Sequence, residues 1–354
     1  MRAPTFWASA RPSPLARLLT PIAMVYGGIA GRRMALNGRR AAVPVICIGN
    51  FTLGGSGKTP TAIRVADMLR EAGEAPVFLS RGYGGRLTGP ARVDPARHGA
   101  GDVGDEALLL ARAAPTVVSA DRLAGARLAA AEGGSVVVMD DGLQNPSLHK
   151  DVAIAVVDGE AGLGNGLVFP AGALRAPLAT QWPQVDAVAI VGDGGRGDVI
   201  ARDADEFGKV VLRARLQPEA EMAAKLKGRG VLAFCGIGRP EKFFRTLEEC
   251  GAVVKTRRAF PDHHPFTAGE IDAVCREAAA TGLLAVTTEK DFVRIAADSG
   301  VAQGAHAIVA LPVRLVLHDE EPLRALIAAR LARAAALTAD GAAPKPRGDS
   351  GALR

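Results

Sequence analysis

The stretch Val43–Thr59, VPVICIGNFTLGGSGKT, constrains the fold more than any other part of this chain. Its first half is a short apolar run rich in β-branched residues, which predicts a buried parallel strand. Its second half is a glycine-rich loop ending in Gly57-Lys58-Thr59, and Pro60–Arg70 has a helical pattern. A strand, a glycine loop, a lysine, a hydroxyl and a helix together predict a site for the phosphates of a nucleoside triphosphate, because backbone N–H groups surround the anion there.

The loop residues predict individual contacts. We expect Lys58 to reach the β- and γ-phosphates and Thr59 to offer its hydroxyl to Mg²⁺. The common pattern has glycine where this chain has Thr52, so Gly54 and Gly55 are expected to supply the backbone freedom instead. The alternative is a glycine-rich turn with an incidental lysine, which the flanking strand and helix make the weaker interpretation. The predicted nucleotide-binding residues are Thr52, Leu53, Gly54, Gly55, Ser56, Gly57, Lys58 and Thr59.

Length and composition limit the class of protein. A chain of 354 residues, 48% hydrophobic and 23% charged, is long enough for two domains with a sizeable core. The net charge of +6 favours anionic partners, but aromatic residues are only 4% and no basic stripe is interleaved with them, which argues against nucleic acid. The four cysteines have no CxxC spacing, so we expect free thiols rather than a metal site or disulfides: Cys47, Cys235, Cys250 and Cys275.

Apolar segments that predict strands alternate with helical segments along most of the chain. This alternation predicts an α/β fold with a doubly wound, mainly parallel sheet, whose ligands bind at the carboxyl ends of the strands. Gly192–Asp205 is polar and is expected to be a surface loop, whereas the long stretch Gly159–Pro177 is expected to be functional. The expected strands after the first are Pro76–Ser80, Thr116–Ser119, Ser135–Met139, Val152–Val157, Ala187–Val191, Val231–Cys235, Ala252–Lys255, Leu283–Thr287 and one or two within His306–Leu317.

We divide the chain into four parts on this basis. Residues 1–40 form a helical N-terminal segment and residues 41–228 a core domain with the phosphate loop. Residues 229–337 form a smaller α/β domain that ends in a helix over Pro322–Ala336. Residues 338–354 are rich in Ala, Pro, Gly and Asp and are expected to be a disordered tail.

The N-terminal segment Pro14–Ala35 is apolar and has arginines near its ends but no acidic residue. Its uninterrupted apolar part, Leu18–Ala30, is short for a transmembrane span and contains Pro21. An amphipathic helix in the membrane interface fits this segment better than a transmembrane span does. A helix packed on the protein core is an equally open alternative to the interfacial helix. No cleavable secretory signal is expected.

Several polar residues follow the predicted strands and can therefore meet at one edge of the sheet. Asp140 and Asp141 are the candidates for holding Mg²⁺, and Gln144 for orienting a substrate or a water molecule. A base near an acceptor hydroxyl is expected at Asp105 or at the pair His263-His264. Guanidinium groups that could bind phosphates are those of Arg81, Arg122 and Arg175.

The order of the motifs along the chain resembles that of a known family. Eight motifs occur in order along Leu15–Ala336, and jointly they resemble the tetraacyldisaccharide 4′-kinases, the lipid A 4′-kinases of Gram-negative bacteria. The form TLGGSGKT of the loop is itself similar to this family. The motifs are GNFTLGGSGKTP, SRGYGG at Ser80–Gly85, GDE at Gly104–Glu106, ADR at Ala120–Arg122, DDGLQ at Asp140–Gln144, FPAGALR at Phe169–Arg175, FPDHHPF at Phe260–Phe266 and TTEKD at Thr287–Asp291.

The resemblance implies transfer of the ATP γ-phosphate to the 4′-hydroxyl of an acylated glucosamine disaccharide 1-phosphate, giving lipid IVA for lipopolysaccharide. It implies an N-terminal helix on the cytoplasmic face of the inner membrane. Asp105 with His263 would activate the sugar hydroxyl, and the metal would be held by Thr59, Asp140 and Asp141. The supporting residues would be Arg81, Arg122, Gln144 and Arg175. No protein partner is evident.

Two positions depart from the family pattern, which usually has His at position 145 and Glu at position 176. This chain has Asn145 and Ala176 there, so the carboxylates of Asp140 and Asp141 would have to suffice for the metal. A membrane-recruited nucleotide-dependent switch or assembly ATPase is the alternative function. Such a protein needs no acceptor-side base, so Asp105 and the FPDHH motif favour the kinase.

Overall fold

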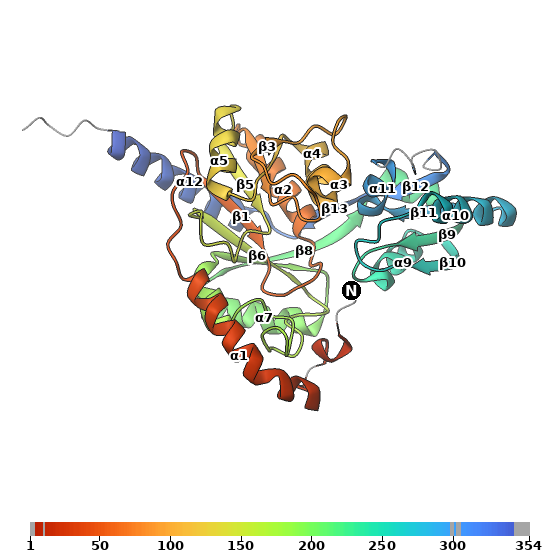
Figure 1. Ribbon diagram of the computed structural model, residues 1–354, viewed down its shortest axis with the longest axis horizontal. Coiled ribbons are helices and arrows are strands. Elements are labelled where there is room, and N and C mark those ends of the chain that lie inside the picture. Colours follow the sequence, from red (N-terminus) through yellow and green to blue (C-terminus); the bar gives the residue numbers. More distant parts are fainter. Residues whose placement is uncertain (1–3, 10, 298–300, 302–305, 343–354) are drawn as a thin grey trace, which may run out of the picture.

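The computed structural model describes residues 4–9, 11–297, 301 and 306–342, and its elements form two sheets with helices around them (Figure 1). The strands are β1 Val45–Gly49, β2 Pro76–Ser80, β3 Ala91–Arg92, β4 Thr116–Val118, β5 Val136–Asp140, β6 Val152–Asp158, β7 Ala187–Val191, β8 Val210–Pro218, β9 Gly230–Cys235, β10 Val253–Ala259, β11 Leu284–Thr288, β12 Ile308–Leu311 and β13 Val313–Leu317.

The helices lie mainly between these strands in the chain. They are η1 Thr5–Trp7, α1 Pro14–Met34, α2 Lys58–Glu71, α3 Ala100–Val103, α4 Asp105–Ala113, α5 Arg122–Ala131, α6 Leu178–Gln181, η2 Trp182–Gln184, α7 Gly195–Glu206, α8 Ala220–Leu226, α9 Pro240–Glu249, α10 Ala268–Thr281, α11 Glu289–Ala296 and α12 Glu321–Ala342.

The larger sheet has nine strands in the order β13-β8-β7-β6-β1-β5-β2-β4-β3. All its pairs are parallel except the two at its edges, β13 with β8 and β3 with β4, so the expected mainly parallel, doubly wound sheet is confirmed. Strand β1 lies between β5 and β6, and the carboxyl ends of these three strands adjoin one another. This is the switch point at which such sheets bind ligands.

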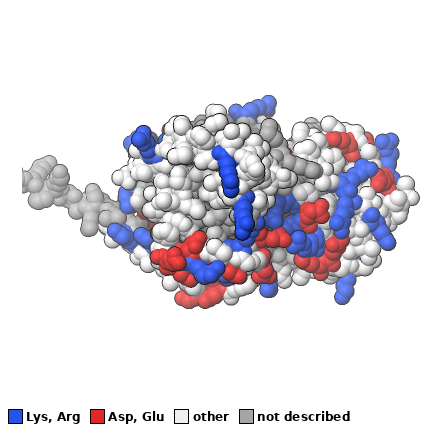
Figure 2. All heavy atoms as spheres, turned by 90° about the horizontal axis from the view of Figure 1, so that it is seen from below, with Lys and Arg blue, Asp and Glu red and all other residues white. Residues whose placement is uncertain are grey.

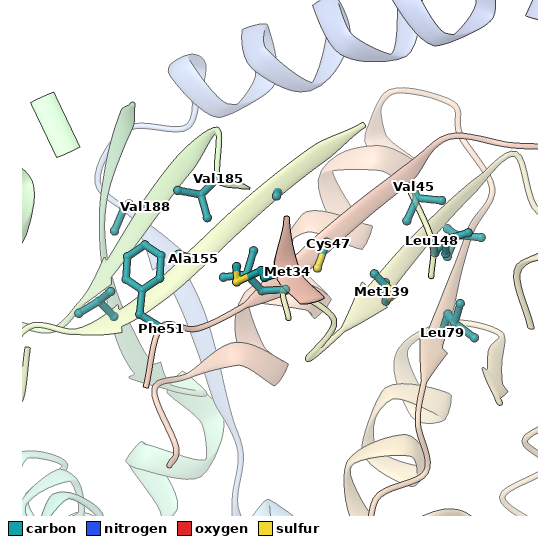
Figure 3. Close-up of a cluster of buried hydrophobic side chains, with 14 of the residues drawn as sticks. Met34, Val45, Cys47, Phe51, Leu79, Met139, Leu148, Ala155, Val185 and Val188 are labelled. Atoms are coloured by element: carbon teal, nitrogen blue, oxygen red, sulfur yellow. The ribbon is translucent and has the colours of Figure 1, made fainter. Parts of the chain in front are cut away.

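Alternation along the strands builds a hydrophobic layer on each face of this sheet. Val45 and Cys47 pack with α1, α5 and α7 on one face, where Figure 3 shows Cys47 between Met34 and Met139 and Val45 near Leu148. Ile46 and Ile48 pack on the other face with α2, α4 and α12. Because neighbouring strand residues point to opposite faces, an unbroken apolar strand is the pattern of a sheet covered on both sides.

The smaller sheet contains β10, β9, β11 and β12, all parallel, with its own core around Phe234 and Phe244. The structure differs from our expectation in where this unit ends. Strand β13 leaves it to pair with β8, and Leu323 and Ile327 of α12 pack on the larger sheet. We therefore propose a smaller unit of about residues 229–312.

Two further expectations differ from the structure. Gly192–Asp205 is not a surface loop but contains α7, whose residues Gly197, Ile200, Ala201 and Ala204 are buried at helical spacing. The glycines at its start concealed this stripe. At the C-terminus, α12 continues to Ala342, beyond the expected helix end at Ala336; the rest of the expected tail, residues 343–354, lies outside the described residues.

Candidate active site

The phosphate loop leaves β1 after Gly49 and enters α2 at Lys58, as expected. Gly54 and Gly57 have left-handed backbone, with φ of 109° and 93°, which a residue with a side chain rarely adopts. Thr52, where glycine is common, instead forms an antiparallel bridge with Leu174. A paired, extended residue needs no glycine, which accounts for the unusual form of this loop.

Lys58 and Thr59 occupy the first turn of α2, and both are nine-tenths buried. The Lys58 ammonium lies 3.9 Å from an Asp141 carboxylate oxygen. The amide of Asn50 donates to the carbonyl of Gly54 at 3.1 Å and so holds the loop in shape. The free N–H groups of this helix end and the Lys58 ammonium form a positively polarised site for phosphate.

Asp140 is the last residue of β5, and Asp141 follows it with a left-handed backbone, φ 48°. Burial, together with the charges of Glu106 and Asp141, raises the pKa of Asp140. At Asp141 burial also acts to raise the pKa, but the charges of Lys58 and Arg175 outweigh it and lower the pKa. Arg175 donates to Asp141 at 3.0 Å. The two neighbouring carboxyls therefore have opposite electrostatic environments.

A magnesium ion fits these residues. Each of Asp140 and Asp141 has a buried Oδ1 atom without a hydrogen-bond partner in the described part of the chain. The described residues contain no cluster of three or more His, Cys, Asp or Glu side chains suited to a metal. Mg²⁺ is commonly held by one or two carboxylates together with substrate phosphates rather than by a full protein cage, so a pair of carboxylates suffices.

Arg175 and Gln144 link the phosphate loop to the segment after β6. Arg175 donates from Nε to the Thr52 carbonyl at 3.1 Å, and Gln144 donates to the Asn50 carbonyl at 2.8 Å and to Gln181 at 3.0 Å. Gln181, which the sequence did not indicate, is fully buried and donates to the Phe51 carbonyl. These contacts give Gln144 and Arg175 a role in shaping the loop and orienting Asp141.

The two positions that depart from the family pattern lie in different surroundings. Ala176 is fully buried in the hydrophobic layer, and its carbonyl accepts from Gln181 at 2.8 Å. Asn145 accepts from the backbone and the hydroxyl of Ser147 at 2.9 and 2.7 Å. Asn145 therefore stabilises its own turn, and Ala176 contributes apolar packing.

Arg122 begins α5 behind its cap Asp121, is 3% exposed and donates to the Ser119 carbonyl. Its Nε atom is buried without a partner among the described residues. Burial and the nearby charge of Arg81, which is itself exposed, lower the pKa of Arg122. Two guanidinium groups that share a site with an unpartnered N–H form a place where an anion is stabilised.

Asp105 and His263 meet although 158 residues separate them in the chain, with His263 Nδ1 3.1 Å from Asp105 Oδ2. Asp105 starts α4 and is 5% exposed, and its Oδ1 accepts from the backbone N–H of Glu106. His263 has a left-handed backbone, φ 56°, and its ring contacts Tyr83 edge-on. The expected carboxylate–imidazole pair is thus brought together by the two units of the molecule.

His264, the other histidine of the motif, turns away from this pair. Its Nε2 atom lies 3.0 Å from Glu270, inside the cap of α10, and its ring stacks on Phe260. Of the two histidines in this motif, only His263 lies beside Asp105.

Two cations from α11 complete the acceptor-side cluster, and we assigned neither of them from the sequence. Arg294 donates to Asp105 Oδ2 from Nη2 at 2.8 Å and from Nε at 3.2 Å. Lys290 Nζ lies 3.0 Å from Glu106 and 3.3 Å from His263 Nε2. The motif TTEKD was the available signal; its last three residues open α11 rather than end the strand.

Burial acts to raise the pKa of Asp105, but the hydrogen bond from His263 and the charges of Lys290 and Arg294 lower it well below its usual range. The charges of Glu106 and Lys290 also act on Asp140. Asp140 is thus influenced both by the acceptor-side cluster and by Lys58 of the phosphate loop. Such a paired arrangement supports phosphate transfer to a hydroxyl that a base activates.

Comparisons with known proteins agree with this geometry. The model of the family described as tetraacyldisaccharide-1-P 4′-kinase, LpxK, matches residues 15–332. The tetraacyldisaccharide 4′-kinase of Methylobacterium nodulans is 58% identical over 332 residues, covering 94% of this chain and 96% of the relative. That of a Bradyrhizobium species is 52% identical over 335 residues, covering 94% and 96%.

A solved structure extends the likeness to the fold. The crystal structure of LpxK from Aquifex aeolicus, in complex with ATP, matches with a TM-score of 0.67 and 27% identity, covering 90% of this chain and 99% of that one. The family model and these relatives lead to one conclusion: the chain belongs to the tetraacyldisaccharide-1-P 4′-kinase family.

Proposed function

We propose that this protein is an ATP-dependent kinase that phosphorylates the 4′-hydroxyl of a tetraacylated glucosamine disaccharide 1-phosphate, giving lipid IVA in lipid A biosynthesis. The proposal is supported above all by the Asp105–His263 pair, 3.1 Å apart, whose neighbours Glu106 and Lys290 act on Asp140 together with Lys58 of the phosphate loop. A nucleotide-dependent switch needs the loop but has no use for an acceptor-side base, so the pair disfavours that alternative.

The chain's own residues then perform the transfer. Lys58 and the N–H groups at the start of α2 hold the β- and γ-phosphates, and Arg81 and Arg122 stabilise charge on the transferred group. The Asp105–His263 pair takes the proton of the 4′-hydroxyl. The hydroxyl oxygen bonds to the γ-phosphorus, and the bond between the γ-phosphorus and ADP breaks. Thr59, Asp140 and Asp141 would hold Mg²⁺, which neutralises phosphate charge when bound.

Helix α1 is proposed to bring the enzyme to the cytoplasmic face of the inner membrane. Its buried stripe includes Ala23, Gly27 and Gly31, while the opposite side exposes Leu18, Ile22, Val25 and Ile29. No helix in the described part of the chain is long and apolar enough to cross a membrane. Seen from the side on which α1 lies, much of the surface is uncharged (Figure 2). An interfacial helix accounts for this exposed apolar stripe.

The position of α1 also couples the membrane to the site. A methyl group at Gly27 would touch Pro177 at 3.4 Å, and one at Gly31 would touch Thr180 at 3.1 Å. Pro177 and Thr180 lie in the segment that follows Arg175 in the chain. A lipid substrate that remains in the membrane would therefore meet the site beside the helix.

The decisive experiment supplies ATP, Mg²⁺ and the tetraacylated disaccharide 1-phosphate and determines the mass of the lipid product. We expect the lipid to gain one phosphate. ATP hydrolysis without phosphorylated lipid, in a preparation shown to be folded, would favour the switch instead.

Flotation with vesicles that contain anionic lipid tests the membrane proposal. Ile22→Glu and Val25→Glu change residues that are 59% and 67% exposed, so the fold should tolerate them while vesicle binding falls. Val199→Glu, at a 45% exposed residue of α7, is the control for adding a carboxylate elsewhere. Unchanged flotation of the α1 variants would contradict an interfacial helix.

A further inference from the structure

Lys290 of α11 reaches the acceptor-side base from the smaller unit of the molecule. Its Nζ atom lies 3.3 Å from His263 Nε2 and 3.0 Å from Glu106 Oε1, and its side chain is 24% exposed. It thus contacts the imidazole on the side opposite Asp105, whose Oδ2 lies 3.1 Å from Nδ1. Both ring nitrogens of His263 therefore have a partner. The ammonium can only donate a hydrogen bond, and the ionised carboxylate can only accept one.

The chemistry of these partners determines where the imidazole proton lies. An ammonium group has donors but no acceptor, so a hydrogen bond with Lys290 requires a lone pair on Nε2. An ionised carboxylate only accepts, so Asp105 requires the N–H on Nδ1. Burial acts to lower the pKa of Lys290, but the charges of Glu106 and Asp105 outweigh it and raise the pKa, which supports an ammonium at neutral pH.

We propose that Lys290 is a positioning residue that holds His263 as the neutral Nδ1–H tautomer and leaves Nε2 as the atom of the pair able to accept a proton. This inference rests on the proposed role of the Asp105–His263 pair. The Asp105 oxygens are already occupied: Oδ2 accepts from Arg294 and His263, and Oδ1 accepts from the Glu106 backbone. Nε2 is the less constrained atom, since the His263 side chain is 34% exposed.

Glu106 allows the lysine to release the imidazole. When the acceptor hydroxyl donates to Nε2 in place of Lys290, the ammonium keeps its counterion at Glu106 and remains charged near the site. A positive charge at this point opposes premature protonation of the pair. The groups in contact with the imidazole are Asp105 of α4, Lys290 of α11 and Tyr83 after β2. Around these partners, Arg294 of α11 donates to Asp105, Glu106 of α4 pairs with Lys290, and the charge of Asp262 acts on Lys290.

The test compares Lys290→Met and Lys290→Arg with a matched control, Lys242→Met. Lys242 of α9 also joins the smaller unit to the larger sheet, but its ammonium pairs with Asp158 at the end of β6 and not with the base. Proton–nitrogen NMR of the imidazoles reports the His263 tautomer without any substrate. We expect a single Nδ1–H form in the unaltered protein, in Lys290→Arg and in Lys242→Met. In Lys290→Met, where no ammonium requires a lone pair on Nε2, we expect an added fraction with N–H on both nitrogens while Asp105 keeps the N–H on Nδ1.

Kinetics give the second readout. In Lys290→Met we expect kcat to fall about tenfold or more, with the KM for ATP changed by no more than about twofold. The acidic limb of its pH–kcat/KM profile should move up by about one pH unit, because removing a positive charge lets the pair take up a proton more readily. Lys290→Arg should restore most of kcat and the original limb.

The outcomes separate the two proposals. The same single Nδ1–H form and an unchanged acidic limb in Lys290→Met would overturn the role of Lys290, even if activity fell. If Lys290→Met does not fold, loss of the single tautomer in Lys290→Arg would overturn it equally. Full activity of His263→Ala would instead refute the base in the proposed function, whatever Lys290 does.

Discussion

The two halves of the candidate active site differ in how their polar groups are satisfied. Around the phosphate loop, five buried side-chain atoms in the described residues lack a hydrogen-bond partner, on Asn50, Ser56, Arg122, Asp140 and Asp141. On the acceptor side, both oxygens of Asp105 are occupied by protein donors. Since a buried unpaired polar atom is costly, we expect the phosphate side to gain its missing partners from a ligand, whereas Asp105 is held by protein donors beforehand.

This difference reflects which parts of the chain build each half. The phosphate loop, the Asp140–Asp141 turn and Arg175 all belong to the larger sheet. The acceptor side joins α4 of that sheet to α11 and the His263 loop of the smaller unit. Variants on the two sides should therefore have separable effects on nucleotide binding, turnover and stability.

Lys58→Ala should have the largest effect. It removes the cation that we propose contacts the β- and γ-phosphates, and it leaves Asp141 with Arg175 as its remaining ion-pair partner. We expect kcat/KM for ATP to fall by about 10³ or more. Steady-state kinetics with varied ATP measures it, and Lys209→Ala, on the segment before β8, is the control for loss of a lysine. A loss below tenfold would remove Lys58 from the phosphate site.

Asp105→Asn should affect turnover rather than nucleotide binding. We expect kcat to fall by about 10² to 10⁴, because an amide is a poor base and cannot pair with His263 in the same way. The dissociation constant of ATP, measured by calorimetry without the lipid, should stay within about twofold. Equal loss of nucleotide affinity would show that the two halves are not separable.

Arg294→Met should lower both stability and turnover. Arg294 and Asp105 are 10% and 5% exposed, and removing one partner leaves a buried carboxylate with fewer donors. We expect the free energy of unfolding to fall by about 2–4 kcal/mol and kcat by about tenfold or more. Denaturant titration measures the first quantity. The double variant with Asp105→Asn should lose less than the sum of the single losses; strict additivity would mean that the pair is not coupled.

The smallest effect concerns stability as a function of pH. Because the pKa of Asp105 is lowered in the folded protein, its contribution is present above the unfolded value, about 3.8, and is lost as the pH falls through the folded value. The difference in unfolding free energy between the unaltered protein and Asp105→Asn should be constant from about pH 5 to 7 and shrink below about pH 4. If this difference in unfolding free energy grew on acidification, the pKa of Asp105 would be raised rather than lowered by folding.

Most of the fold could be predicted because its signals are local. The apolar strands of the larger sheet reveal themselves by composition, and β2 and β7 have the expected bounds. The prediction of a surface loop over Gly192–Asp205 was wrong because the glycine-rich start of α7 resembles a loop. The buried stripe of this helix becomes meaningful only when the sheet lies beneath it. The return of β13 to β8 joins residues about a hundred positions apart, which no local pattern records.

The sequence by itself determined the phosphate half of the site, because the loop, the lysine and the hydroxyl are contiguous and their chemistry follows from that order. It also brought Asp105 and His263 forward as candidates. Only the tertiary structure decided that Lys290 and Arg294 complete the cluster, and that His264 belongs instead to the cap of α10. The physical reason is that these side chains come from separate elements of two units, so their partners are set by packing and not by spacing in the chain.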